Sequence, residues 1–501
     1  MKQRKITAMI LAAALSVSVN SGMVLADGYQ EVEKAKMAEA IAELIEEYKP
    51  ALESYTMDSS AQADISLALG ETGRALLGML VPVDISWANN IGLDMQTTVE
   101  GSDQAILGNL YLNDTDVLTI EMIMNQETMQ SCMRIPELHD SYLLVDMAME
   151  EAEAFPMPED PTELLPDAET LEKILTKYTD ILFAGFEESV SRVETIDVEG
   201  VKMECTTMED KRRAEDIQSV AENFLMTLQT DTDIKDLIEK WAALVPSETD
   251  AYSEFRSSIN EAINEVTQNP LEDDGSYILS KIWLSKEDKI VGREIALVAE
   301  GTENVLVIRY KAPETEESSA LLLEMEVDGE ALVLKGNGTI TDGKLSGIYT
   351  VSMNGADMIA IEVKDQFTDE ATGENGGSYR LAVLEGIGAE EYESLGMFGL
   401  LLECYANQTN KQSQVYATIE MSGSPIVTIG IGGETCEALE IVDVAELENT
   451  LDTASEDDMV TYVTEMDWTP IIENFVEAGM PEELAAELDN LIYTSIYGEV
   501  E

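Results

Sequence analysis

The chain has 501 residues, of which 100 are aspartate or glutamate and 29 are lysine or arginine, so its formal net charge is −71. A charge of this sign repels nucleic acids, heparin-like polymers and anionic membrane surfaces, because each of them needs a basic footprint on its partner. With 45% hydrophobic and 26% charged residues, the composition is that of a folded protein rather than of a disordered acidic chain.

The first 26 residues have the three zones of a cleavable secretory signal peptide. Lys2, Arg4 and Lys5 form a positive start, residues 6–19 are apolar, and Val24-Leu25-Ala26 precedes the cleavage point. This apolar stretch is too short to cross about 30 Å of hydrocarbon, which takes about 20 residues. We therefore expect an exported protein, secreted or associated with the cell envelope, with no transmembrane span after cleavage. An uncleaved membrane anchor is the alternative. Cleavage removes three positive charges and no acid, which takes the net charge from −71 to −74.

Residues 27–150 predict one helix followed by an antiparallel meander. Met37, Ile41, Leu44 and Tyr48 recur at intervals of 4, 3 and 4 residues, as on the apolar side of a helix that packs against a sheet, and Pro50 follows soon after. Farther along, apolar residues recur at every second position, which is typical of strands with one buried face. The expected strands cover residues 65–69, 93–99, 106–112, 118–124 and 142–145.

Residues 151–270 predict a helical block that contains one strand pair. The strands lie on either side of the turn Glu199-Gly200. Apolar residues at helical spacing mark four helices, over residues 171–185, 217–228, 237–244 and 255–266.

Residues 271–440 predict a second antiparallel meander, and residues 441–501 a C-terminal helical segment. The dipeptides Asp328-Gly329, Asp342-Gly343 and Asn354-Gly355 each allow the positive φ angles of a type I′ hairpin turn. Within this meander, residues 387–408 are expected to be helical. The chain as a whole therefore predicts an α+β protein. Its long antiparallel meanders, of the open half-barrel type, accompany a central helical block and terminal helices.

The sequence shows no catalytic, cofactor or metal motif. The single histidine, His139, lies in a turn between two expected strands, which is typical of a surface residue, and no GxSxG motif accompanies it. Asp231, Asp233 and Asp236 resemble the start of a calcium loop, but the sixth position is aspartate instead of glycine and no glutamate closes the loop. We expect a protein that is not an enzyme and holds no cofactor or metal ion.

Four cysteines, Cys132, Cys205, Cys404 and Cys436, are far apart and form no CxxC pair. In an oxidising compartment they allow up to two disulfides, in any of three connectivities, or they remain buried free thiols. The sequence leaves both alternatives open. Their spacing and the single histidine disfavour zinc.

The candidate binding residues are apolar. Met122 and Met124 fall on one face of an expected strand, and thioethers make an adaptable lining for an apolar groove. Tyr349, Val351 and Met353 share one face of another strand, with polar residues between them. These five residues are a candidate lining for an apolar ligand, and ordinary core packing is the alternative.

Short segments resemble known exported proteins. The motifs Ile135-Pro136-Glu137-Leu138, Val198-Glu199-Gly200-Val201 and Val291-Gly292-Arg293-Glu294 look like those of uncharacterised exported proteins of clostridial bacteria. More distantly, residues 30–440 resemble the lipoprotein-carrier superfamily (LolA-like and LppX-like proteins), whose fold is an open antiparallel half-barrel with helices on its concave side. This resemblance implies binding of acyl chains in an apolar hollow. The chain departs from many members of that superfamily because it lacks their lipid-anchor cysteine.

Three functions fit the sequence. The first is a secreted, non-enzymatic, envelope-associated protein that binds a lipid or another apolar ligand in its curved sheet. The second is an extracellular module that binds an envelope protein or the cell wall. The third is a hydrolase with a divergent carboxylate site.

Overall fold

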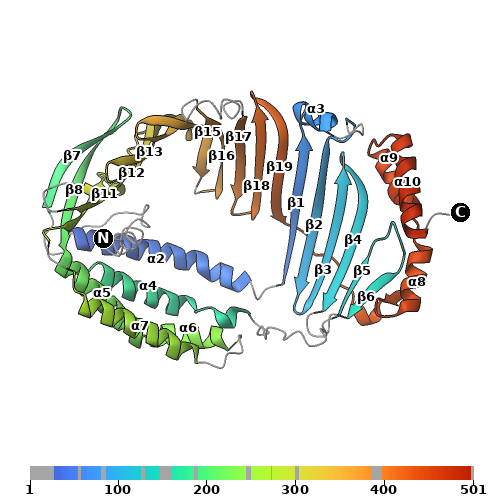
Figure 1. The fold of residues 1–501 in the computed structure, drawn as a ribbon, viewed down its shortest axis with the longest axis horizontal. Helices are drawn as coiled ribbons and strands as arrows, with labels where there is room; N and C mark the ends of the chain where they lie inside the picture. Colours follow the sequence, from blue (N-terminus) through green and yellow to red (C-terminus); the bar gives the residue numbers. More distant parts are fainter. Residues whose placement is uncertain are drawn as a thin grey trace. The chain divides into compact units, whose positions relative to one another are not determined.

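The structure is a computed structural model of the 501-residue chain. It describes residues 28–54, 58–80, 86–125, 130–146, 161–184, 190–243, 250–271, 274–299, 304–369, 371–384 and 398–497. The expected signal peptide, residues 1–26, lies outside the described residues. The fold is α+β with long antiparallel strands, as the sequence predicts (Figure 1). Among the helices that the structure describes, none is long and apolar enough to span a membrane.

The chain divides into two compact units, and the boundary falls within strand β15 (Ala356–Asp369). Unit 1 comprises residues 1–56 and 155–360, and unit 2 comprises residues 57–154 and 361–501. The first predicted helix therefore belongs to the unit that holds the helical block. The predicted second meander contributes strands to both units.

Unit 1 combines helices with an antiparallel sheet whose strands pair in sequence order from β7 to β14. Its helices are α2 (Tyr29–Ser54), η1 (Pro161–Leu164), α4 (Ala168–Leu182), α5 (Ala214–Thr230), α6 (Thr232–Ala242) and α7 (Ala251–Gln268). Its strands are β7 (Val190–Val198), β8 (Val201–Arg213), β9 (Tyr277–Leu284), β10 (Ile290–Val298), β11 (Asn304–Lys311), β12 (Ser318–Val327), β13 (Glu330–Thr341) and β14 (Lys344–Met353).

The hairpins of unit 1 turn at the dipeptides that the sequence marks. Asp328, Asp342 and Asn354 have φ angles of 53°, 51° and 51°, and the glycine after each of them also has a positive φ. The Glu199-Gly200 turn between β7 and β8 has the same backbone, with φ angles of 47° and 89°. Asparagine, aspartate and glycine adopt this left-handed conformation at low cost, so the predicted type I′ turns are confirmed.

The unit 1 sheet is curled. Val198 and Val201, at the tip of the β7–β8 hairpin, pack against Ala320 of β12. Asn337 of β13 donates a hydrogen bond of 2.7 Å from Nδ2 to the carbonyl oxygen of Glu199 in the same tip. Side chains of the β7–β8 hairpin thus contact β12 and β13. The described strands of the unit do not pair to close a barrel.

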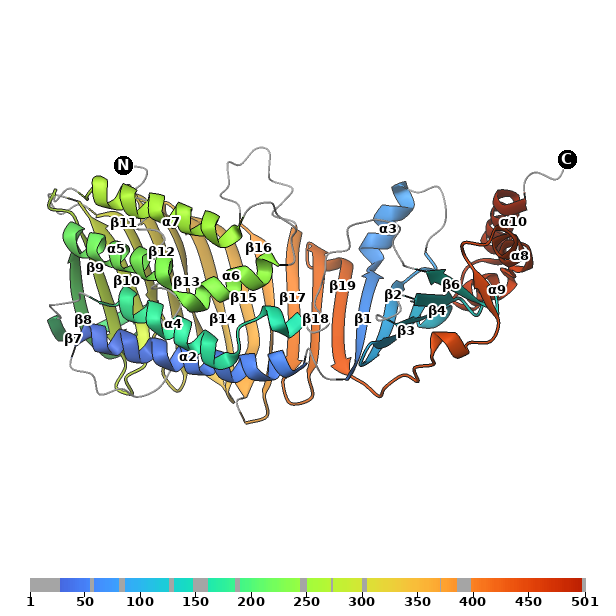
Figure 2. The same ribbon diagram turned by 90° about the horizontal axis from the view of Figure 1, so that it is seen from below.

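Helices lie over one face of the unit 1 strands, as Figure 2 shows. The main core of the unit lies where α2, the end of α4 and strands β8 to β10 meet. It consists of Tyr29, Val32, Phe183, Met208, Ile278, Ile282, Leu284, Ile290 and Ile295.

Helix α2 packs against the sheet as predicted, but its buried stripe differs from the predicted one. Ile41 and Ile45 are buried along α4, whereas Leu44 is exposed. The sequence placed Pro50 soon after this helix, and that is wrong, because the helix continues through Pro50 to Ser54. Proline removes one backbone donor, and here the missing hydrogen bond does not end the helix.

Unit 2 joins two distant parts of the chain in one antiparallel sheet. Its strands are β1 (Ser59–Leu69), β2 (Asn90–Glu100), β3 (Asp103–Leu112), β4 (Thr115–Asn125), β5 (Gln130–Arg134), β6 (Tyr142–Asp146), β16 (Glu374–Val383), β17 (Phe398–Asn407), β18 (Gln412–Met421), β19 (Ser424–Thr435) and β20 (Thr450–Asp452). Strands β16 to β19 are consecutive, β19 pairs with β1, and β1 to β6 follow. The short β20 pairs in parallel with β6.

The other elements of unit 2 are α3 (Glu71–Leu80), η3 (Val444–Glu446), α8 (Glu456–Glu465), α9 (Thr469–Glu477) and α10 (Glu482–Tyr497). The predicted helix over residues 387–408 is wrong where the structure describes it, because residues 398–407 form β17. A short apolar run fits a buried helix and a strand equally well, and pairing with β16 and β18 on both sides decides in favour of the strand.

Candidate functional site

Cross-strand register gathers apolar residues of β11 to β14 on one side of the unit 1 sheet. One row of successive partners consists of Ile308, Met325, Leu332 and Met353. The neighbouring row consists of Tyr310, Leu323, Leu334 and Val351. Alternate residues of a strand share a side, so both rows point the same way. We call these eight residues, together with Leu306 and Val327, the unit 1 apolar face; none of the ten is charged, and Glu330, the register partner of Val327 on β13, lies next to them on the same side.

The same rows continue under the helices. Ile308 pairs with Ile295 of β10, and the row continues through Ser280 of β9 to Asp210 of β8. Ile295, Ser280 and Asp210 are buried. At the other end of the row, Met325 and Met353 are 46% and 49% exposed. One surface of the sheet is thus covered over β8 to β10 and accessible over β12 to β14.

Tyr349 borders the unit 1 apolar face on β14. Its register partner on β13 is Gly336, and a Cβ on that glycine would come within 2.7 Å of the tyrosine ring. The absence of a side chain at Gly336 therefore allows the ring to lie across β13. Tyr349 is buried, and this burial raises the pKa of its phenol.

A buried ion pair holds α2 on the sheet beside the unit 1 apolar face. Arg293 of β10 donates from Nη1 and Nη2 to the two carboxylate oxygens of Glu33, at 2.5 and 3.0 Å. Burial alone would lower the pKa of Arg293, but the charge of Glu33 outweighs it and the pKa is raised. Arg293 is the register partner of Tyr310. The pair therefore lies at the border between the covered and the accessible part of the sheet.

Unit 2 has a larger uncharged surface, on one side of the five adjacent strands β17, β18, β19, β1 and β2. Val415, Ile431, Ile65 and Leu93 are successive partners, and Ala417, Ile429, Leu67 and Ile91 form the next row. None of the described residues that point to this side of the five strands is charged. We call this surface the unit 2 apolar face; its apolar members include Phe398, Leu400, Leu402, Val415, Ala417, Ile419, Met421, Val427, Ile429, Ile431, Ile65, Leu67, Leu69, Ile91, Leu93, Met95 and Val99.

Exposure in this part of unit 2 is the reverse of that in an ordinary soluble sheet. Ile65 and Ile431 of the unit 2 apolar face are 49% and 57% exposed. Thr418 and Glu420, on the opposite side of β18, are only 6% and 8% exposed. Antiparallel sheets usually bury the apolar side and leave the polar side in water. The reversal marks the apolar side as a surface that needs a partner.

The five predicted lining residues do not gather in one unit. Val351 and Met353 belong to the unit 1 apolar face, and Tyr349 borders it. Met122 and Met124 lie on β4 of unit 2, where Met122 pairs with Ile106 and with Met133. Strand alternation correctly placed Tyr349, Val351 and Met353 on one side of β14. The buried pair of Glu33 and Arg293 gave no such signal, because the two residues are 260 positions apart.

His139 lies in the turn between β5 and β6, as predicted, but the prediction of a surface residue is wrong. Its side chain is buried against the ring of Tyr462, with 4.8 Å between the ring centroids. Nδ1 accepts a hydrogen bond of 2.9 Å from the backbone amide of Ser141. The histidine therefore fastens the turn to α8.

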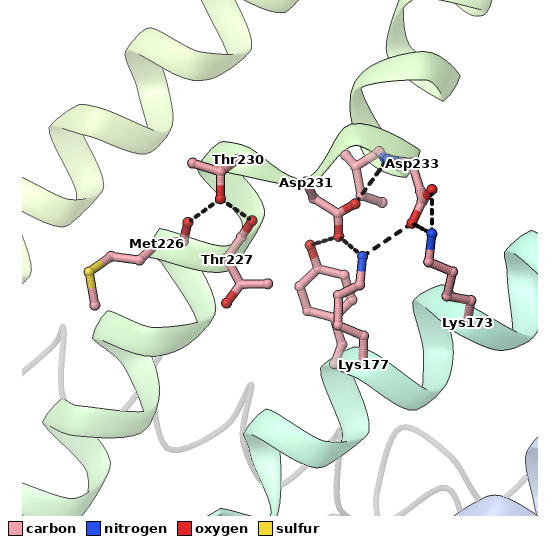
Figure 3. A network of polar contacts seen from close by, with 9 residues as sticks. Lys173, Lys177, Met226, Thr227, Thr230, Asp231 and Asp233 are labelled. Atoms are coloured by element: carbon pink, nitrogen blue, oxygen red, sulfur yellow. Dashed lines mark hydrogen bonds and ion pairs between the residues drawn. The ribbon is translucent and has the colours of Figure 1, made fainter.

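The aspartates near the start of α6 bind protein groups (Figure 3). Asp231 accepts hydrogen bonds of 2.7 Å from Lys177 Nζ and 2.8 Å from the hydroxyl of Tyr178, and it caps α6. Burial alone would raise the pKa of Asp231, but these donors lower it. Lys173 and Lys177 also pair with Asp233. Lysines thus neutralise two of the three carboxylates that resembled a calcium loop, Asp231 and Asp233.

Within the described ranges, no group of three or more histidine, cysteine or acidic side chains has the geometry to hold a metal ion. The sequence allowed either disulfides or free thiols, and the structure has Cys132, Cys205, Cys404 and Cys436 as free thiols. The first two are buried.

No family model matches the chain, and no curated protein matches its sequence. The resemblance to lipoprotein carriers therefore stays a prediction.

Proposed function

We propose that this protein is exported, acts without catalysis at the cell envelope, and binds an apolar ligand of the acyl-chain class on the unit 1 apolar face. One observation carries the proposal. Ten neighbouring uncharged positions form a surface whose inner edge, at Ile308, is partly buried against the main core of the unit, while Leu323, Met325 and Met353 remain nearly half exposed.

The size of the surface suits a small apolar ligand. Four strands at a spacing of about 4.8 Å are about 19 Å wide, and three alternate residues along a strand add about 20 Å in the other direction. Covering such a surface removes apolar area from water, which is worth about 25 cal/mol for each Å². Ile308, at the inner edge of the face, packs against the core that contains Tyr29 and Val32 of α2, so a ligand at this edge would lie next to that helix.

The charge of the chain selects among apolar ligands. The unit 1 apolar face offers no cation to an anionic headgroup, and the net charge of −71 disfavours anionic ligands further. Acyl chains need no hydrogen-bond partner, which fits a face that has only one hydroxyl group, that of Tyr310, at its edge.

The test measures binding of diphenylhexatriene, an uncharged apolar fluorophore, to the chain expected after export, residues 27–501. Met325→Lys places a charge in the middle of the face. Ile348→Lys is the matched control, because Ile348 lies on the opposite side of β14 and is 63% exposed. We expect Met325→Lys to weaken binding by about 30-fold, the effect of losing a residue worth about 2 kcal/mol. The control should bind like the unaltered chain.

Two results would overturn the proposal. One is an unaltered chain that neither binds the fluorophore nor carries an apolar molecule detectable by native mass spectrometry. The other is an equal loss of binding in Met325→Lys and Ile348→Lys, since a site on one side of the sheet predicts a difference between them.

A further inference from the structure

We infer that the unit 2 apolar face is the docking surface for a second copy of this chain, with the two sheets packed face to face. The inference concerns a different unit from the proposed ligand site and does not depend on it. It starts from the reversed exposure of β18 and its neighbours, where isoleucines face water and a threonine and a glutamate are buried.

The area of the face matches that of a stable dimer. Five strands at a spacing of about 4.8 Å are about 24 Å wide, and ten residues at about 3.3 Å each are about 33 Å long. The face therefore covers about 800 Å², which is the area that each partner contributes to a standard interface. Interfaces of permanent homodimers are also the most apolar ones, resembling a domain core cut in half.

The openness of the face favours a second sheet over an alkyl chain. In unit 2, helix α3 contacts β19 and β1 near their ends, and α9 contacts β4, beyond the five strands. An acyl chain lying on this broad surface would keep one side in water. A second sheet at the usual separation of about 10 Å would bury the side chains of both faces, as in a β-sandwich.

A heterologous protein partner fits less well. A protein interface of this kind usually carries about one hydrogen bond for each 100–200 Å². The described residues on this side of the five strands offer few side-chain donors or acceptors, chiefly the hydroxyl groups of Ser59, Thr97, Ser413, Ser424 and Thr435. A second copy needs none, because its own uncharged face is the complement in a two-fold symmetric pair.

The acidic character of the chain does not prevent this pairing. The carboxylates of these strands, such as Asp64, Asp94 and Glu420, lie on the opposite side of the sheet from the unit 2 apolar face. In the pair they would be separated by two sheets, a distance greater than the Debye length of about 8 Å in physiological salt. The remaining repulsion falls as salt rises, so the pair should become tighter in salt.

The test is sedimentation equilibrium of residues 27–501 over about three decades of concentration. Val415 and Tyr416 supply a matched pair of variants, because they are neighbours on opposite sides of β18 and are 43% and 40% exposed. We expect the unaltered chain to dimerise reversibly, and more tightly in about 1 M than in about 0.15 M salt. Val415→Lys should weaken the dimer by about 100-fold or more, since each substitution occurs twice in a symmetric pair. Tyr416→Lys should dimerise normally.

Ile431→Lys is a second variant in the same face, and far-UV circular dichroism of each variant reports whether it folds. The inference is overturned if the unaltered chain is monomeric at every concentration and salt. It is also overturned if both Val415→Lys and Ile431→Lys, folded, leave the dimer intact. A monomer that carries a lipid, lost on Val415→Lys, would assign the face to a ligand instead. Met325→Lys should leave the dimer unchanged, so failure here and failure of the proposed function can be told apart.

Discussion

Replacing Glu33 with glutamine should loosen α2 from the unit 1 sheet. The variant keeps the size of the side chain and removes the charge that faces Arg293. The two side chains are 0% and 7% exposed, so the guanidinium would keep its charge in a place that water does not reach. Removing one partner of a buried ion pair costs about 3–5 kcal/mol, because the remaining charge is left without compensation. We expect about 3 kcal/mol, since Tyr29 also lies beside the arginine and retains its hydroxyl.

Native-state hydrogen exchange of the α2 amides is the suitable measurement. It reports the free energy of local opening and does not require the two units to unfold in a single transition. A loss of about 3 kcal/mol should speed exchange in α2 by more than about 100-fold. Lys34→Gln is the control on the same helix. It breaks the ion pair between Lys34 and Asp180, whose side chains are 32% and 59% exposed. Such surface pairs stabilise a protein by about 1 kcal/mol or less.

The double variant Glu33→Leu with Arg293→Met completes the test. It removes both charges together, and replacing a buried pair by apolar residues of similar volume is often neutral or stabilising. We expect slow exchange of α2 to return. If Glu33→Gln changes exchange no more than Lys34→Gln does, the pair does not hold α2 and the reasoning is refuted.

Three further predictions concern other parts of the chain. Asp94 pairs in register with Asp64. Burial raises the pKa of Asp94, and the hydrogen bond with Asp64 and its charge raise it further. Because the pKa of Asp94 is higher in the folded than in the unfolded chain, the free energy of unfolding falls as the pH rises above the ordinary value of 3.8. Asp94→Asn should therefore raise the urea midpoint at about pH 7, by the equivalent of about 0.5 kcal/mol, and change it little at about pH 3; a lower midpoint near neutral pH would contradict this. Burial raises the pKa of Cys132, and that of Cys205 to about 11, so neither should react with a thiol reagent in the native protein at about pH 8. Mass spectrometry of labelled peptides checks it, and early labelling of either thiol would count against the structure. Gly336→Val should lower the melting temperature and the near-ultraviolet circular dichroism of the tyrosines, because its Cβ would meet the carbonyl oxygen of Ile348 and the ring of Tyr349 on β14; an unchanged melting temperature and signal would contradict this packing.

Local features of this fold could be predicted because they depend on neighbours in sequence. The turn at Asp342-Gly343 needs only two residues that accept positive φ, and both have it. The strand that contains Tyr349, Val351 and Met353 follows from a period of two, and β14 has the predicted alternation. Helix α2 follows from a period near 3.6, although the stripe was displaced by one residue at Leu44.

The rest depended on contacts that no local pattern encodes. Strand β19 pairs with β1, so that Ile431 faces Ile65 across a separation of more than three hundred residues. The contact of Glu33 with Arg293 also joins distant positions. Alternation also does not say which side of a strand faces water. The pattern around Ile65 predicts an apolar side and a polar side, and the usual assignment would bury the isoleucine. Only the assembled sheet shows that it is exposed.

The excess of acids and the two apolar faces can be understood together. A protein that exposes isoleucines and methionines in rows risks random aggregation, which a large net charge of one sign opposes. Repulsion of this kind acts on every approach that brings acidic surfaces together. It acts least on an approach in which two uncharged faces meet and the carboxylates stay on the far sides of the sheets. A charge of −71 therefore does more than keep the chain in solution, because it penalises other modes of association and leaves face-to-face docking as the least opposed.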